Sequence, residues 1–167
     1  MQSTKLILPS RISSLSKLNR FLNTNEFHGA RYFILLDENT YNHCLALLIQ
    51  NVSALEGAEF MEVPVGEECK SIEIAVQLWQ TLMESGADRN SVIVNLGGGS
   101  VCDLGGFVAA AFKRGIRYIN IPTTLLAMVD ASVGGKTAVD LGPTKNQIGF
   151  FHHPVATCIE PAFLHSV

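Results

Sequence analysis

The sequence lacks long apolar runs, paired cysteines and an excess of positive charge. No stretch approaches the roughly 20 apolar residues that a membrane-spanning helix needs, and the N-terminus has no apolar core of signal-peptide length. We therefore expect a cytoplasmic protein with no membrane partner. The net charge of -3 at pH 7 gives no reason to expect nucleic acid as a partner. The densest basic cluster (Lys113, Arg114 and Arg117) is too short for a nucleic-acid tract and is typical of a solvated helix end.

Metal-ligand spacing is also missing. The 4 cysteines and 5 histidines include no Cys-x-x-Cys or His-x-x-x-His pair, which argues against a zinc ribbon and a disulfide framework. These residues are Cys44, Cys69, Cys102 and Cys158, and His28, His43, His152, His153 and His165. The adjacent His152 and His153 cannot easily face one ion together. We expect buried thiols and no metal site in this chain.

Short β-rich runs alternate with helical patterns, and 47% of the residues are hydrophobic, which excludes a disordered chain. The expected strands cover residues 5–8, 32–36, 58–63, 91–96, 116–121 and 156–159. The expected helices run from a cap at Ser10 to about residue 22, over 41–51, from a cap at Ser71 to a stop at Gly86, over 100–112, and from 161 onward. This alternation predicts an α/β fold, a Rossmann-like parallel sheet with helices on both faces. After Pro122, glycines and polar residues indicate an extended loop or hairpin region that lines a site.

The segment Gly97-Gly-Gly-Ser-Val-Cys-Asp103 joins a predicted buried strand to a predicted helix. Its glycines allow the backbone to approach a ligand closely, and the helix N-terminus offers free N–H groups to a phosphate. Asp103, expected in the first turn, can accept a hydrogen bond from a ribose or from a nicotinamide-side group. The segment is not the Gly-x-Gly-x-x-Gly fingerprint. A tight structural turn, with Asp103 favouring the helix dipole, explains it equally well.

Polar residues follow the strand that ends near Pro122. Thr123 and Thr124 stand where ligands gather in open α/β sheets, and Asp130, a glycine pair and Lys136 follow. A glycine-rich turn that presents one lysine is a plausible anion site, although the P-loop spacing is absent and a surface hairpin is the alternative. Lys145 and Asn146 add a second cation and an amide, which can clamp a sugar phosphate or simply belong to a solvated loop.

Residues 97–154 closely resemble the core of 3-dehydroquinate synthases. The run reads GGGSVCDLGGFVAAAFKRGIRYINIPTTLLAMVDASVGGKTAVDLGPTKNQIGFFHHP. The resemblance implies that residues 1–167 are that family's N-terminal NAD-binding domain. The family holds its divalent metal, zinc or cobalt, in a second, mainly helical domain, whose one glutamate and two histidines would fall beyond Val167. We therefore expect a truncated fragment that lacks the metal ligands and is inactive alone.

Members of this family are carbon–oxygen lyases of the shikimate pathway of aromatic amino acid biosynthesis. They convert 3-deoxy-arabino-heptulosonate 7-phosphate to 3-dehydroquinate and phosphate. NAD oxidises an alcohol transiently, phosphate is eliminated, the ketone is reduced again and the opened ring closes by an aldol step. The ketone acidifies the C–H beside the departing phosphate, so elimination becomes feasible.

The resemblance also implies a set of cofactor contacts. They are Asp37, Asn39, Glu67, Lys70, Gly98, Gly99, Ser100, Val101, Cys102, Asp103, Thr123, Thr124, Lys136, Lys145, Phe163, Leu164 and Ser166. Asp37 and Asn39 would meet the adenosine ribose, and the glycines would cradle the pyrophosphate. Ser166 replaces a family threonine and keeps its hydroxyl, whereas Val65 stands where the family commonly has an acidic residue.

The implied catalytic residues surround the substrate and the nicotinamide. They are Asp130, Lys136, Lys145 and Asn146. Arg114 matches a family arginine that reaches the substrate phosphate from the neighbouring subunit, which implies a homodimer.

Three other readings remain open. Another sugar-phosphate cyclase would share the cofactor loop, and Asp130, Lys145 and Asn146 favour dehydroquinate synthase without deciding the matter. Alcohol and glycerol dehydrogenases share the Gly-Gly-Gly-x-x-x-Asp turn but continue with a Thr-Gly-Ser-Glu-like segment, where this chain has residues 125–132. A stand-alone nucleotide-binding module that acts as a regulator or scaffold is the third.

Overall fold

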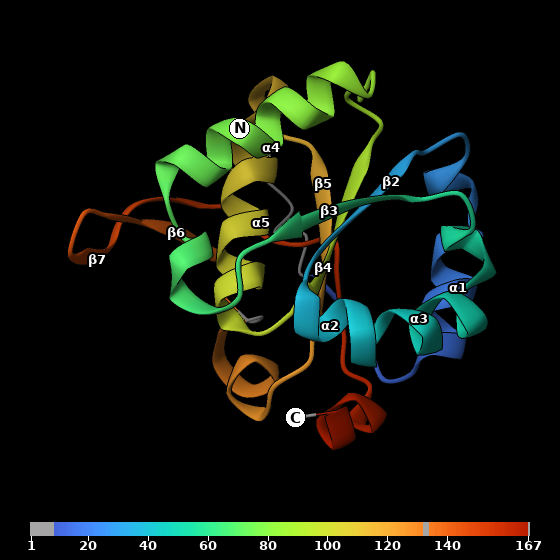
Figure 1. Ribbon diagram of the computed structural model, residues 1–167. Helices are drawn as coiled ribbons and strands as arrows, with labels where there is room; N and C mark the ends of the chain where they lie inside the picture. Colours follow the sequence, from blue (N-terminus) through green and yellow to red (C-terminus); the bar gives the residue numbers. More distant parts are fainter. Residues whose placement is uncertain (1–8, 132–133, 167) are drawn as a thin grey trace, which may run out of the picture.

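The computed structural model describes residues 9–131 and 134–166, which form a parallel sheet covered by helices on both faces (Figure 1). The six strands lie in the order β1-β8-β5-β4-β2-β3, and every neighbouring pair is parallel. Their bounds are β1 (Ser10–Ile12), β2 (Tyr32–Asp37), β3 (Glu59–Val63), β4 (Val92–Gly97), β5 (Arg117–Pro122) and β8 (Ala156–Cys158). The predicted Rossmann-like α/β class is confirmed.

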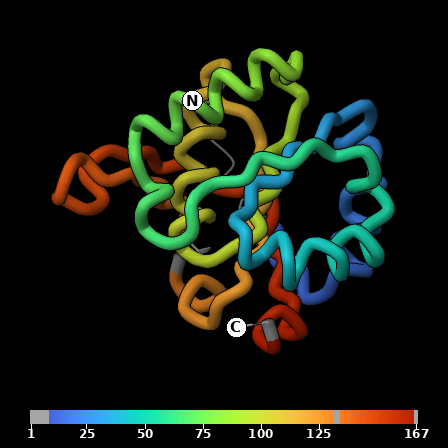
Figure 2. Tube along the Cα trace, viewed as in Figure 1, coloured from blue at the N-terminus to red at the C-terminus, as the bar shows by residue number. Residues whose placement is uncertain are grey.

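Helices and a hairpin complete the described chain. The helices are α1 (Leu15–Leu22), α2 (Glu38–His43), α3 (Leu45–Asn51), α4 (Ile72–Glu84) and α5 (Gly99–Ala111). The 3-10 turns are η1 (Asn25–Phe27), η2 (Ser53–Leu55), η3 (Gly66–Cys69), η4 (Phe112–Arg114) and η6 (Pro161–Ser166), and η5 (Ala127–Ala131) is a short π-helix. Strands β6 (Lys136–Leu141) and β7 (Thr144–Phe151) form an antiparallel hairpin that extends away from the sheet (Figures 1 and 2). None of the helices in the described part of the chain has the length and apolar character that crossing a bilayer requires.

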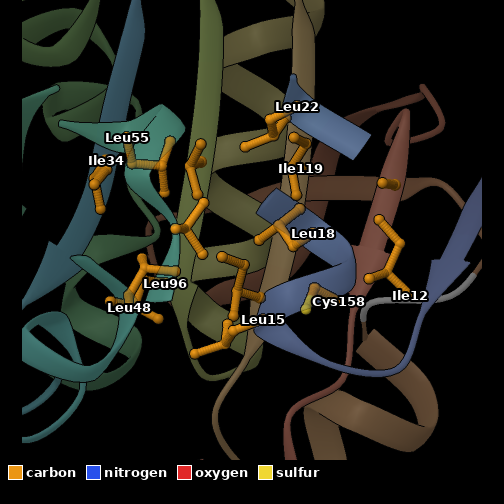
Figure 3. Packing of buried hydrophobic residues seen from close by; sticks show 14 of the residues in the cluster. Ile12, Leu15, Leu18, Leu22, Ile34, Leu48, Leu55, Leu96, Ile119 and Cys158 are labelled. Atoms are coloured by element: carbon orange, nitrogen blue, oxygen red, sulfur yellow. The ribbon is translucent and has the colours of Figure 1, made fainter. Parts of the chain in front are cut away.

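The buried strands divide their side chains between two cores. In β2, Ile34 and Leu36 pack in the core that holds α1 and α3, whereas Phe33 and Leu35 pack in the core that holds α4 and α5. Figure 3 shows the first core, where the leucines of α1 lie against the sheet. Successive residues of a strand point to opposite faces, so a continuous apolar run is what a sheet covered on both sides requires.

The N-terminal prediction was wrong about the start of the first helix. Ser10 belongs to strand β1, and the helix begins at Leu15, where Ser14 accepts a hydrogen bond from the backbone N–H of Lys17 at 3.3 Å. Strand β1 exists because it pairs with β8, from the far end of the chain, and a local pattern carries no sign of that partner. The strand predicted over residues 5–8 lies outside the described residues.

The helix predicted over residues 41–51 is two helices. Asp37 and Thr40 form a capping box that starts α2 directly after β2, three residues earlier than predicted, and the chain departs from helical geometry at Cys44. The predicted cap at Ser71 and stop at Gly86 are confirmed: Ser71 accepts from the N–H of Ile74 at 3.2 Å, and Gly86 has φ of 74°.

The cysteines are buried, as predicted. Burial raises the pKa of the Cys69 and Cys158 thiols to about 12, so these side chains stay protonated and unreactive at neutral pH.

Helix α5 lies unusually close to the sheet. A Cβ added at Gly105 would lie 1.7 Å from Oδ1 of Asn95 on β4, and one at Gly106 would lie 2.5 Å from Cγ2 of Thr137 on β6. Trp79 of α4 donates a hydrogen bond from Nε1 to the carbonyl of Val108 at 3.0 Å. These contacts fix the position of α5 against both the sheet and the hairpin.

We predict that Gly105→Ala destabilises the protein by about 1–3 kcal/mol, because the new methyl group overpacks a buried site. Asn95 cannot simply move aside, since its Nδ2 donates to Asn120 in the core at 2.9 Å. Helix propensity alone would predict the opposite change in the free energy of unfolding, because replacing glycine by alanine inside a helix stabilises it by about 1 kcal/mol. Chemical denaturation measures the difference, and a more stable variant would contradict the close packing of α5.

Candidate functional site

The carboxyl ends of β2, β4 and β5 meet at one edge of the sheet, beside the starts of α2 and α5 (Figure 1). A cavity of about 510 Å³ opens there, which we call the helix-terminus cavity. It is lined by Asp37, Asn39, Thr40, His43, Cys44, Gly66, Gly98, Gly99, Ser100, Val101, Thr123 and Thr124. In open α/β sheets, ligands bind outside the carboxyl ends of the strands, which is the place that this cavity occupies.

The N-terminus of α5 opens onto this cavity without a side-chain cap. Gly98 is the N-cap residue, and no acidic residue stands in the first turn. The first intrahelical bond closes from the N–H of Cys102 to the carbonyl of Gly98 at 3.1 Å, so the amides of residues 99–101 have no acceptor inside the helix. Gly98 and Thr124 both line the cavity, and a Cβ at Gly98 would stand 3.2 Å from Cγ2 of Thr124. Free amides and a positive helix end favour an anion there.

Asp37 lines the opposite side of the helix-terminus cavity and is 8% exposed. Its Oδ1 accepts hydrogen bonds from the backbone N–H of Thr40 at 2.9 Å and from the Thr40 hydroxyl at 3.2 Å. No described residue donates to its Oδ2. The capping box thus orients the carboxylate and leaves one oxygen available to a hydroxyl-bearing ligand.

A second cavity, also of about 510 Å³, lies between α5, η5 and the β6–β7 hairpin, and we call it the hairpin cavity. Its lining residues are Asp103, Asp130, Lys136, Thr137, Ala138, Asn146, Gly149, Phe150 and Phe151. Three of the four residues predicted to be catalytic therefore come together: Asp130, Lys136 and Asn146.

The structure places Asp103 differently from the prediction. It stands in the second turn of α5, not the first, and it lines the hairpin cavity. The helix begins at Gly99, and the Asp103 carboxylate lies beside the Lys70 ammonium group, away from the residues that line the helix-terminus cavity. Burial raises the pKa of the Asp103 carboxyl, and the charge and hydrogen bond of Lys70 oppose this shift.

Lys70 lies between the two cavities: it contacts Asp103 and Asn146 of the hairpin cavity and, through Glu67, is connected to Ser100 of the helix-terminus cavity. Its side chain is 4% exposed, and its ammonium group donates to Asn146 Oδ1 at 2.6 Å and forms an ion pair with Asp103 Oδ2 at 3.1 Å. Asp140 Oδ1 and Glu67 Oε2 lie farther from Nζ, at 3.9 Å and 3.8 Å. Glu67 in turn accepts a hydrogen bond from Ser100 Oγ at 2.7 Å, at the mouth of the helix-terminus cavity. The loop after β3 is therefore tied to α5 and to the hairpin.

Other predicted residues lie outside both cavity linings. Arg114 and Lys145 are exposed, and Arg114 has a positive φ of 68° in the turn after α5. The Phe163 side chain is 1% exposed and packs in the core, with Leu164 against it. Cys102 is buried with its Sγ directed at the carbonyl of Gly97. The side chain of Ser166 lies outside the described part, and the predicted roles of these residues stay predictions.

The basic cluster divides into two parts. Lys113 and Arg114 are exposed after the end of α5, as predicted for a solvated helix end. The same prediction was wrong for Arg117, which starts β5, lies over the Phe27 ring at 4.6 Å and donates to the carbonyl of Glu26 at 2.9 Å.

Sequence reasoning missed several cavity residues. Thr40 had a signal, because the Asp-x-x-Thr spacing after a buried strand is typical of a helix start. Gly66, Thr137 and Phe150 had none, since their place depends on how the loop after β3 and the hairpin fold over α5. Within residues 9–131 and 134–166, no three His, Cys, Asp or Glu side chains are grouped to hold a metal ion.

The fold is a Rossmann-like α/β domain, which this chain shares with solved sugar-phosphate cyclases and, as a fold alone, with an iron-containing alcohol dehydrogenase. Residues 60–167 match the family model described as 3-dehydroquinate synthase N-terminal. The chain belongs to the 3-dehydroquinate synthase family.

Known proteins agree with this assignment. The chain is 43% identical over 152 residues to the 3-dehydroquinate synthase of Parabacteroides distasonis, which covers 91% of this chain and 42% of that protein. A 2-deoxy-scyllo-inosose synthase, solved with carbaglucose-6-phosphate, NAD⁺ and Co²⁺, superimposes with a TM-score of 0.79 at 25% identity over 93% of this chain and 43% of that one.

A 2-epi-5-epi-valiolone synthase from Streptomyces hygroscopicus, solved with NAD⁺ and Zn²⁺, has a TM-score of 0.76 at 27% identity over 100% of this chain and 47% of that one. The chain spans less than half the length of these relatives.

We predict that Lys70→Met destabilises the protein by roughly 3 kcal/mol, because it leaves Asp103 and Asp140 partly buried without their cation. Thermal or chemical denaturation measures the loss. Lys17→Met is the matched control: Lys17 is exposed and bonds the Ser13 hydroxyl at 2.9 Å, so its loss should change stability by no more than about 0.5 kcal/mol. Equal stability of the two variants would show that the Lys70 network does not hold the loop.

Proposed function

We propose that this chain is the NAD-binding part of a 3-dehydroquinate synthase, which converts 3-deoxy-arabino-heptulosonate 7-phosphate to 3-dehydroquinate and phosphate. One observation carries the proposal: an uncapped helix terminus faces one cavity, and a cavity with carboxylates, an amide and a lysine adjoins it through the Lys70 network. A redox cofactor and a phosphorylated substrate need such neighbouring sites. The family membership supports the choice of this reaction.

The helix-terminus cavity fits NAD. The free amides at residues 99–101 suit the diphosphate, and the absence of a Cβ at Gly98 keeps room for it. Asp37 Oδ2 suits the hydroxyls of the adenosine ribose, and its negative charge disfavours the extra phosphate of NADP. When bound, NAD supplies the hydride acceptor that turns a substrate alcohol into a ketone.

In the hairpin cavity, this chain's own residues hold and orient the substrate. Lys136 balances the charge of an anionic group, and Asn146 offers an amide to a hydroxyl or phosphate oxygen. Phe150 and Phe151 add an apolar surface to the lining beside the polar groups. Asp130 accepts hydrogen bonds from substrate hydroxyls. These contacts position the phosphate for departure.

The described residues do not fit a metal site. We propose a divalent metal, zinc or cobalt, for the complete enzyme, because two cyclase relatives were solved with Co²⁺ and Zn²⁺. We also propose a homodimer in which Arg114 reaches the substrate phosphate of the neighbouring subunit. Its exposed position outside both cavities is compatible with that reach.

A second cyclase reaction is the alternative. The structure with a TM-score of 0.79 is a 2-deoxy-scyllo-inosose synthase solved with a carba-analogue of glucose 6-phosphate. Phosphate release from the heptulosonate phosphate but not from glucose 6-phosphate supports dehydroquinate synthase. The reverse preference identifies the alternative, and no release from either would remove the cyclase proposal.

We predict that Lys136→Ala lowers the rate of phosphate release at least about a hundredfold while the protein stays folded, because the lysine charge at the departing group is lost. The assay uses the protein in the length in which it is naturally produced, with a divalent metal and, in parallel, with a chelator. Lys17→Ala serves as the charge-matched control. Near-normal release by Lys136→Ala would remove Lys136 from the substrate site.

We predict that Asp37→Asn weakens NAD binding about tenfold, or about 1.4 kcal/mol, because a charged acceptor for the ribose hydroxyls becomes neutral. The preference for NAD over NADP should fall as well. Asparagine retains the cap on α2, so the fold is preserved. Titration calorimetry measures both cofactors, and Asp88→Asn, which changes another turn carboxylate remote from both cavities, is the control. Unchanged affinity in Asp37→Asn would place the ribose elsewhere.

A further inference from the structure

Asp140 contacts Asn146, which lines the hairpin cavity, and faces Lys70, and it is not among the cofactor contacts and catalytic residues that the family resemblance implies. It is the penultimate residue of β6, and the pairing with β7 shifts register there. Its backbone N–H donates to the carbonyl of Lys70 at 2.9 Å, and Ser71 forms an isolated parallel bridge with it. The loop after β3 and the hairpin are thus joined at Asp140 by backbone contacts.

The Asp140 carboxylate holds the backbone of Asn146. Asp140 Oδ1 accepts a hydrogen bond from the Asn146 N–H at 2.9 Å. Asn146 has φ of 55°, in the left-handed region, which asparagine adopts more often than most side-chain-bearing residues but still infrequently. A conformation of this kind persists when its surroundings hold it, and this hydrogen bond does so across the hairpin turn.

The same carboxylate faces the cation that holds the Asn146 side chain. Asp140 Oδ1 lies 3.9 Å from Lys70 Nζ, and Lys70 Nζ donates to Asn146 Oδ1 at 2.6 Å. An ammonium group only donates hydrogen bonds, so it fixes which end of the amide turns toward it. The oxygen faces Lys70, and the Nδ2 donor group is left for a ligand.

We propose that Asp140 is a positioning residue of the substrate site: it fixes Asn146 at its backbone directly and at its side chain through Lys70, so that the amide presents N–H donors to an oxygen of an anionic or hydroxylated substrate. This role rests on the proposed function and adds Asp140 to the substrate site as a residue that acts through Asn146. A misplaced amide keeps its chemistry and loses its alignment, which lowers the rate of the bound complex.

The experiment compares Asp140→Ala, Asp140→Asn and Asn146→Ala, singly and as the double variant Asp140→Ala/Asn146→Ala, in the protein at its natural length. We expect Asp140→Ala to lower kcat/KM for phosphate release about tenfold to a hundredfold, mainly through kcat, with NAD affinity unchanged. Asp140→Asn keeps an oxygen acceptor for the Asn146 N–H, so we expect it to recover kcat/KM to within about threefold of the wild type.

The double variant tests whether Asp140 affects the reaction through Asn146. If Asp140 works through Asn146, adding Asp140→Ala to Asn146→Ala changes kcat/KM by less than about threefold. Multiplying losses would overturn the proposal, as would an Asp140→Ala variant within twofold of the wild type. Asp88→Ala is the matched control, because Asp88 Oδ1 likewise accepts a backbone hydrogen bond, from Asn90 N–H at 2.9 Å, remote from both cavities. Asp140→Val, which suits a strand and has no acceptor for the Asn146 N–H, replaces Asp140→Ala if the latter does not fold.

Hydrogen exchange at the Asn146 amide supplies a readout that needs no activity. We expect Asp140→Ala to speed that exchange about tenfold and Asp140→Asn to leave it close to the wild-type rate. If the wild type releases no phosphate, the proposed function fails, and the exchange rates still decide whether Asp140 holds Asn146. Unchanged exchange in Asp140→Ala would overturn the positioning role whatever the reaction is.

Discussion

The arrangement of both cavities depends on the contacts that the Lys70 ammonium group makes with Asp103, Asp140 and Asn146. Lys70 is buried, and it contacts groups from α5 and from the hairpin while its backbone continues the loop after β3. A buried cation is costly unless carboxylates and hydrogen bonds surround it. Asp103 and Asp140 supply charge, and Asn146 supplies an amide oxygen. The segments that carry these groups are therefore held together by an electrostatic requirement that none of them satisfies alone.

Helix α5 transmits this constraint to the helix-terminus cavity. Gly105 and Gly106 let the helix lie close to Asn95 and Thr137, so its first turn has a fixed place at the edge of the sheet. One end of the helix is thereby directed at a ligand, while Asp103, one turn later, belongs to the neighbouring cavity. A single helix thus contributes residues to the linings of both cavities, so no flexible segment is needed to set the position of one relative to the other.

Much of the site could be predicted, because its residues cluster in short segments with evident chemistry. The glycines of residues 97–99, the threonines after β5 and the lysine after the glycine pair can be recognised from their local spacing. The structure places Gly98, Gly99, both threonines and the lysine in the linings of two cavities. The error over Asp103 came from assuming that the helix starts after the glycines, whereas it starts within them. Asp140 escaped notice because one acidic residue in a hairpin has no local signature.

Periodicity and glycine placement in the sequence by themselves determined the parallel sheet, its two covering layers and the presence of a helix terminus at the glycine segment after β4. These depend on interactions between residues close in the chain or on whether a run is apolar on both faces. Only the tertiary structure decided that Ser10 pairs with the strand near the end of the chain, that Lys70 is buried, and that Asp140 faces Asn146. The first two depend on segments far apart in sequence, whereas Asp140 and Asn146, six residues apart, meet because the β6–β7 pairing is irregular there. The free energy of burying a group such as the Lys70 ammonium depends on partners that arrive only when the whole chain has packed.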